Sequence, residues 1–151
     1  LYCGALSTLH VLTDGLQPVA CLRGGPRVPV FGSVCSVAEA HDGRRVFMGD
    51  VGGPSVHVWD TGTWSWLARV EMGTGGGAGC YLAVAPHDRL LYVGTEWGRF
   101  YAYSISREAP QCVEDGGGGG ALAVHPSLPE HVVVLAQKRL LLRHTGHLSG
   151  I

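Results

Sequence analysis

The chain has 151 residues, of which 46% are hydrophobic and 15% are charged, and its formal net charge is −1. This length allows one sizeable hydrophobic core, while the few, scattered basic residues argue against a nucleic-acid-binding surface. No apolar run approaches the roughly 18 residues that a membrane-spanning helix needs, so we expect no membrane contact.

The first predicted element is a strand–turn–strand unit at residues 9–22, with the sequence LHVLTDGLQPVACL. Similar units follow as VHVWDTGTWSWLAR, FYAYSISREAPQCV and, at the end of the chain, LLLRHTGHLSGI. Their first residues, Leu9, Val56, Phe100 and Leu140, are 47, 44 and 40 residues apart. A repeat of this length in a sequence without helical periodicity is typical of β-propeller blades.

Short β-rich runs broken by Gly, Asp and Pro recur along the whole chain. In chain order the predicted strands are residues 8–13, 18–22, 33–38, 45–49, 55–60, 64–70, 81–85, 90–94, 99–104, 109–113, 121–125, 132–136 and 139–144. Asp42-Gly43 is a strong hairpin signal between two of them. Gly15, Gly62 and Gly146 share one register inside the repeated units, where we expect a positive φ.

These elements predict an all-β fold, an incomplete β-propeller of four-stranded antiparallel blades. We name the strands of a blade a to d in chain order, so that the repeated unit is the outer c–d pair. The pattern accounts for about three to three and a half blades: a half blade at 1–24, blades at 30–72 and 79–115, and a partial blade at 120–151. We expect the chain to be a fragment of a larger, seven-bladed ring, with completion by a second chain as the alternative.

Glycine-rich stretches separate the predicted blades at residues 23–25, 73–79 and 116–120. Exposed backbone N–H groups in such runs can hold phosphate. No Lys-Ser or Lys-Thr pair follows them, however, and no helix is predicted to begin there. We therefore interpret these stretches as flexible linkers.

The segment VAEAHDGRRVFMGD and the phrase VHVWD that follows it resemble the strands, Asp-Gly turn and closing Trp-Asp pair of a WD40 repeat. As a pattern the resemblance covers residues 33–145, but only one repeat has the Trp-Asp pair, and glycine runs replace the family's Gly-His before strand a. The family's buried Asp–His–Ser/Thr–Trp network is therefore not expected here. The stretch LAVAPHDRLLYVGTEWGRFYAYSI is similar, over about one blade, to YVTN-type and lactonase-like seven-bladed propellers. The chain thus looks like a divergent WD40/YVTN-like propeller.

The predicted b–c connection Glu96-Trp97-Gly98-Arg99 contains the main candidate for partner binding. Trp97 lies between charged residues and outside the strand alternation, and Trp and Arg are over-represented among interface hot spots. In propellers the b–c and d–a loops line one face. On this face we predict a partner-binding rim, with local packing of Trp97 as the alternative reading. Its members are Trp97, Arg99, Glu96, Asp50 and Lys138.

No catalytic residues, metal ligands or cofactor are predicted. His41-Asp42 recurs as His87-Asp88 at equivalent a–b turns, where we interpret the aspartates as caps of the turn backbone. The pair His144 and His147 provides too few ligands for zinc, which needs at least three from the protein.

Trp64 and Trp66 alternate with Ser65 in a predicted strand d. We expect both indoles to face one side of that strand and to pack between neighbouring blades, because aromatic side chains supply a large contact area. Trp59 is expected to lie in the core.

The chain has five cysteines: Cys3, Cys21, Cys35, Cys80 and Cys112. An odd number without a Cys-x-x-Cys pair is a poor framework for disulfides or a zinc site. We expect reduced thiols packed as small hydrophobes, and hence an intracellular, cytoplasmic protein.

These observations favour a non-enzymatic scaffold that binds protein partners through the loop face of the propeller, without nucleic acid or a small-molecule substrate. The alternative is a ligand-binding or hydrolytic propeller of the lactonase or quinoprotein type. That function requires charged side chains from several blades to converge on an axial pocket, for which the loops offer Asp50, Glu96, Arg99 and Lys138.

Overall fold

A computed structural model describes residues 1–5, 7–25, 32–51, 55–72, 80–85, 89–106, 110–117, 121–124, 131–136 and 139–144, with the backbone alone from residue 113 onward. All regular secondary structure in these residues is β-strand. The strands are β1 (Tyr2–Ala5), β2 (Thr8–Leu12), β3 (Pro18–Arg23), β4 (Val34–Glu39), β5 (Arg45–Asp50), β6 (Ser55–Asp60), β7 (Trp66–Glu71), β8 (Cys80–Val84), β9 (Leu90–Thr95), β10 (Arg99–Ser104), β11 (Gln111–Gly117), β12 (Ala121–Val124), β13 (His131–Ala136) and β14 (Arg139–His144).

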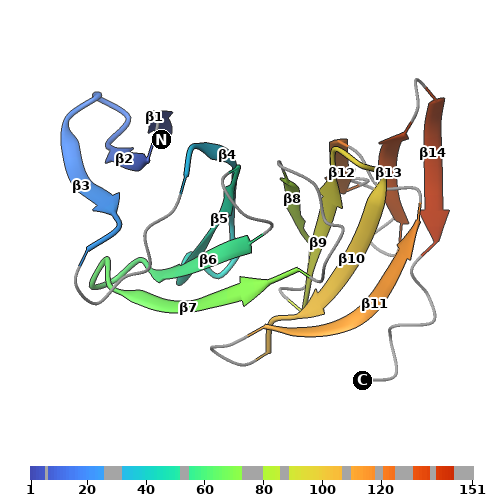
Figure 1. Cartoon of the computed structure of the whole chain (residues 1–151). Helices are drawn as coiled ribbons and strands as arrows, with labels where there is room; N and C mark the ends of the chain where they lie inside the picture. Colours follow the sequence, from blue (N-terminus) through green and yellow to red (C-terminus); the bar gives the residue numbers. More distant parts are fainter. Residues whose placement is uncertain are drawn as a thin grey trace.

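The strands form four antiparallel sheets that stand side by side (Figure 1). The second sheet has the order β4-β5-β6-β7 and the third the order β11-β10-β9-β8, so each is a four-stranded meander. The first sheet, β1-β2-β3, and the fourth, β12-β13-β14, have three described strands each. Strand β4 contacts both β1 and β8, and β8 contacts β12. Neighbouring sheets therefore meet at their innermost strands, which confirms the predicted all-β propeller architecture.

Most strands lie where the sequence predicts them, and three of the c strands, β6, β10 and β14, have the predicted bounds. Strand β1 was not predicted, because its four residues, YCGA, carry little β signal; it pairs along β2 from Tyr2↔Val11 to Ala5↔Thr8. Strand β11 runs to Gly117, into the glycine stretch that we expected to be a linker. Gly116 and Gly117 pair with Phe100 and Arg99, since backbone hydrogen bonds need no side chain.

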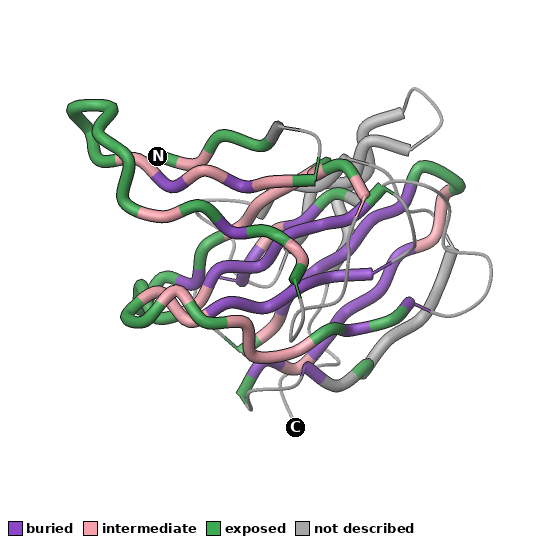
Figure 2. The backbone as a smooth tube through the Cα atoms, turned by 60° about the vertical axis from the view of Figure 1, so that its left-hand side comes forward, coloured by how far each residue is buried: buried purple, intermediate pink, exposed green. Residues whose placement is uncertain are grey.

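The larger hydrophobic core lies between the second and third sheets. Along β6, Val56 and Val58 belong to it, and along β9, Leu91 and Val93 do, so every second residue of each strand faces the neighbouring sheet. Phe47 from β5 is fully buried in the same cluster. Figure 2 shows the buried segments concentrated in these central strands. Strands β5, β6, β9 and β10 are buried at almost every position, as expected of sheets covered on both faces.

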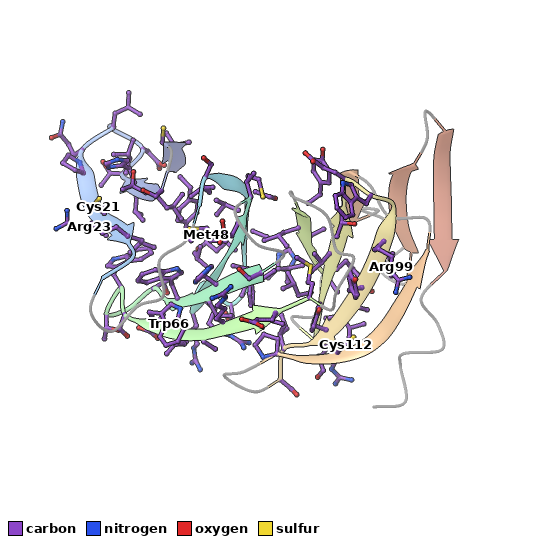
Figure 3. The ribbon with its side chains drawn as sticks, viewed as in Figure 1. Cys21, Arg23, Met48, Trp66, Arg99 and Cys112 are labelled. Carbon is purple, nitrogen blue, oxygen red and sulfur yellow. The ribbon has the colours of Figure 1, made fainter. Side chains whose placement is uncertain are left out.

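A second core joins the first sheet to the second. It comprises Leu9, Val11, Leu22, Val46, Met48 and Trp59. Trp64 and Trp66 pack against this core, which confirms their predicted place between neighbouring sheets; Figure 3 labels Trp66 and Met48. Trp64 is not part of a strand, however, because β7 begins at Trp66 and Trp64 has a φ of 53°. The prediction that Trp64 belongs to the strand is therefore wrong, although both indoles face the same core, as expected.

The turns follow the predicted chemistry at one place and depart from it at another. Gly43 has a φ of 68° and the Asp42 carboxylate accepts a hydrogen bond from the Arg44 N–H at 2.9 Å, so this Asp does cap its turn. Gly15 and Gly62 do not have the expected positive φ. That conformation falls instead on Leu16, with a φ of 59°, and on Trp64.

In both c–d loops the positive φ falls on the residue just before the one whose carbonyl closes the loop. The Leu16 N–H donates to the Thr13 carbonyl at 2.9 Å, which places Gly15 inside the turn and makes Leu16 the residue that must reverse the chain. In the second loop, Asp60 N–H donates to the Ser65 carbonyl at 2.9 Å. Trp64 is therefore the last residue enclosed by this hydrogen bond, directly before Ser65.

Two close contacts hold the innermost strands of adjacent sheets together. The Leu82 N–H on β8 donates to the Ser36 hydroxyl on β4 at 3.1 Å, which satisfies a donor on the free edge of β8. At Gly4, an added Cβ would lie 3.0 Å from Cβ and Cγ1 of Val34. The missing side chain thus permits β1 to approach β4.

The cysteines depart from expectation in their burial. Among the described residues, Cys3, Cys21, Cys35 and Cys112 form no disulfide, but all four are exposed, so they are not packed as small hydrophobes. Cys3 and Cys21 both lie opposite His10 in the first sheet, on the face turned away from the second sheet. That face is the more polar one, which explains their exposure.

Candidate functional site

The b–c turn between β9 and β10 is a compact, internally bonded structure. The Gly98 N–H donates to the Thr95 carbonyl at 3.0 Å, and the Arg99 N–H donates to the Thr95 hydroxyl at 3.1 Å. Thr95 is buried, and Gly98 has a φ of 81°, which a residue with a side chain rarely adopts. These contacts fix the path of the two residues between them, Glu96 and Trp97.

Trp97 is the prominent surface feature of this turn, with 71% of its area exposed. The other three tryptophans of the chain are buried or half-buried. Glu96 is exposed beside it. Within the residues that the structure describes, neither Trp97 nor Glu96 has a hydrogen bond, ion pair or ring contact. The alternative reading, local packing of Trp97, therefore finds no support in this part of the chain.

Arg99 begins β10 and is half-buried. Its guanidinium lies over the ring of Tyr101, 5.9 Å from the ring centroid, because alternate residues of a strand lie on the same face. Figure 3 labels Arg99 on its strand. The cation is thus directed along the sheet and toward Tyr101 by a cation–π contact.

Asp50 lies in the interior, with only 3% of its area exposed. Its carboxylate accepts a hydrogen bond from the Gly32 N–H at 2.7 Å and one from the Ser55 hydroxyl at 3.5 Å. Asp50 therefore ties the chain that enters β4 to the end of β5. Because its oxygens are covered, Asp50 does not contribute to an exposed rim, contrary to its place in the predicted set.

His57 completes a buried polar cluster with Asp50 and Ser55 that the sequence did not reveal. Its Nε2 lies 3.8 Å from Asp50 Oδ2, and both Ser55 and His57 are fully buried. Burial lowers the pKa of His57 below its usual value, and Arg69 lowers it further, while Asp50 acts in the opposite direction. One feature of the sequence could have indicated this cluster: in the predicted meander, Asp50 and Ser55 lie opposite each other across the b–c turn.

This cluster contains the residue types of a hydrolytic triad, but its arrangement differs. In such triads the imidazole lies between the hydroxyl and the carboxylate, whereas here the carboxylate of Asp50 is the group next to both partners. The cluster is also covered by protein. Its contacts stabilise the second sheet at the b–c end.

The WD-type tryptophan does not share in this cluster. Trp59 Nε1 is buried and has no hydrogen-bond partner among the residues that the structure describes.

The structure brings only part of the predicted rim together. Glu96, Trp97 and Arg99 share one turn, and Asp50 is buried in the neighbouring sheet. Lys138 lies outside the described residues. In the described part of the chain, no three His, Cys, Asp or Glu side chains gather as a metal site. Over the same residues, no helix has the length and apolar character to cross a membrane.

Comparison with known proteins identifies the fold. No family model matches the chain, and no curated protein matches it. Among solved structures, that of U3-55K, a WD40 β-propeller protein, aligns with a TM-score of 0.71 at 14% sequence identity. The alignment covers 95% of this chain and 47% of that one, so the chain spans about half the length of that structure. The chain has a WD40-like β-propeller fold.

Proposed function

We propose that this chain acts as a protein-interaction scaffold, a divergent WD40-like propeller segment that binds its partner through the b–c and d–a loop face. The observation that carries this proposal is the 71% exposure of Trp97 on a turn held rigid by Thr95 and Gly98. A pre-ordered aromatic side chain contributes contact area at little entropic cost, which is why Trp is common among hot spots.

Further apolar surface lies at the same end of the sheets. Val51 directly follows β5, and Tyr81 is near the start of β8; both are exposed large hydrophobic residues. In an antiparallel meander, the b–c turns and the starts of the a strands lie at one end of the sheet. Val51, Tyr81 and Trp97 therefore support a binding face there. We also propose an intracellular location for this scaffold, with which cysteines that form no disulfide in the described part of the chain are compatible.

The scaffold function has more support than the hydrolytic alternative. Asp50 is buried, whereas Glu96 is exposed at a turn tip and Arg99 contacts Tyr101. Asp50 is thus covered by protein and Arg99 is held against Tyr101, so these described side chains offer little support for a channel-centred active site, which requires charged groups that converge on an axial pocket.

The test is a quantitative pull-down with the parent protein and two variants. Trp97→Ala combined with Arg99→Ala should weaken the capture of a specific partner. Leu16→Ala is the matched control, because Leu16 is 63% exposed in a c–d turn at the opposite end of its sheet. If the double variant retains every protein that the Leu16→Ala variant retains, the loop face is not the binding surface.

A further inference from the structure

We infer that the Trp97–Glu96 turn recognises a positively charged side chain, lysine or arginine, on a segment of the partner protein. This inference rests on the proposed function, and it adds the chemistry of the group that the loop face selects. The observation behind it is an exposed indole directly next to an exposed carboxylate.

The face of an indole carries negative electrostatic potential and attracts a cation within about 6 Å. Trp97 is 71% exposed and, in the described part of the chain, has no ring contact. Its face is therefore open to a cation from outside.

Arg99, the cation of the same turn, is two residues from Trp97. Its guanidinium lies over Tyr101 at 5.9 Å, on a strand whose direction the Thr95 hydroxyl helps to fix through the Arg99 N–H. The sheet thus holds the internal cation at a different ring and leaves Trp97 to a partner.

Glu96 precedes Trp97 in the same rigid turn, and its carboxylate has no ion pair among the described residues. A cation that rests on the indole gains an attraction from this carboxylate, whereas an anionic side chain is repelled by both groups. A neutral aliphatic side chain gains only the apolar contact with the ring.

The probes are five-residue peptides with the sequence Gly-Ser-X-Ser-Gly, acetylated and amidated, in which X is lysine, arginine, norleucine or glutamate. Norleucine has the length of lysine without its charge. Binding to the full chain is followed by the NMR shift of the Trp97 indole N–H, which is assigned by its loss in Trp97→Phe. We expect the lysine and arginine peptides to bind about threefold to thirtyfold more tightly than the norleucine peptide, and the glutamate peptide to bind most weakly.

Two charge variants separate the local effect from the net charge. Glu96→Gln should reduce the preference for lysine over norleucine by about twofold to fivefold. Asp14→Asn removes the same charge from an exposed position in a c–d turn, at the opposite end of its sheet, and should leave the preference unchanged. The amide spectrum of each variant outside the turn shows whether the fold is retained.

Three results would overturn the inference: equal binding of the lysine and norleucine peptides, a preference for glutamate, or no saturable shift with either cationic peptide. In each case the loss of the natural partner in the Trp97→Ala, Arg99→Ala variant would still stand as evidence for the loop face. The charge preference and the proposed function therefore fail independently.

Discussion

Replacement of Phe47 by alanine tests whether the sheets are held together by the core between the second and third sheets. Phe47 is fully buried on β5 and belongs to the cluster that contains residues of both sheets. Its loss removes most of a buried aromatic side chain and leaves a cavity, and such changes cost about 3–5 kcal/mol. A domain of this size has a total stability of about 5–15 kcal/mol, so the variant should lose a substantial part of its stability.

The assay is urea unfolding followed by circular dichroism, with the free energy of unfolding extrapolated to water. Val19→Ala is the control, because Val19 is half-exposed on β3 and should cost under about 1 kcal/mol. Phe47→Leu is the fallback if the alanine variant does not fold, with an expected loss of about 1–2 kcal/mol. A loss under about 1 kcal/mol for Phe47→Ala, or equal losses for Phe47→Ala and Val19→Ala, would refute the inter-sheet core.

Three further predictions follow from single contacts. Ser36→Ala removes the acceptor of the Leu82 N–H and should lower the free energy of unfolding by about 1 kcal/mol in urea titrations; an unchanged midpoint would contradict the link between β4 and β8. Because burial lowers the pKa of His57, the unfolded chain binds a proton there more readily than the folded chain. The contribution of His57 to stability should therefore be fully present above a pH of about 6.5 and be lost as the pH falls below it. In thermal melts, the His57→Gln variant should lack this part of the decrease in melting temperature at low pH. Trp97→Phe should shift the fluorescence emission to the blue and reduce quenching by acrylamide, whereas Trp66→Phe should leave the quenchable fraction in place.

The architecture could be predicted because each blade repeats a short β pattern. The c strands β6 and β10 are flanked by hairpin turns and carry strong β-forming residues, so their bounds agree with the prediction. Strand β1 lacked such a pattern, since a glycine and a cysteine occupy half of its residues. It forms because its neighbour β2 offers a hydrogen-bonding edge, which is information that a local sequence window does not contain.

The candidate site was only partly predictable for a related reason. Trp97 stands out because an aromatic residue between charged neighbours does not fit a strand. Asp50 looked like a surface residue because aspartate is usually exposed, but its burial depends on Gly32 and Ser55, which pairing and chain entry bring to its carboxylate. Burial of a charge is decided by tertiary partners, so the sequence around Asp50 could not show it.

Photo-crosslinking from a benzophenone amino acid placed at position 97 tests most directly whether the loop face binds a protein partner. If the loop face binds the partner, we expect one dominant crosslinked protein, and its labelled segment should carry a lysine or arginine close to the point of attachment. The same probe at position 16, in the c–d turn at the other end of a sheet, should give no such product. Equal labelling of that partner from both positions, or none from position 97, would contradict the claim that this face binds it.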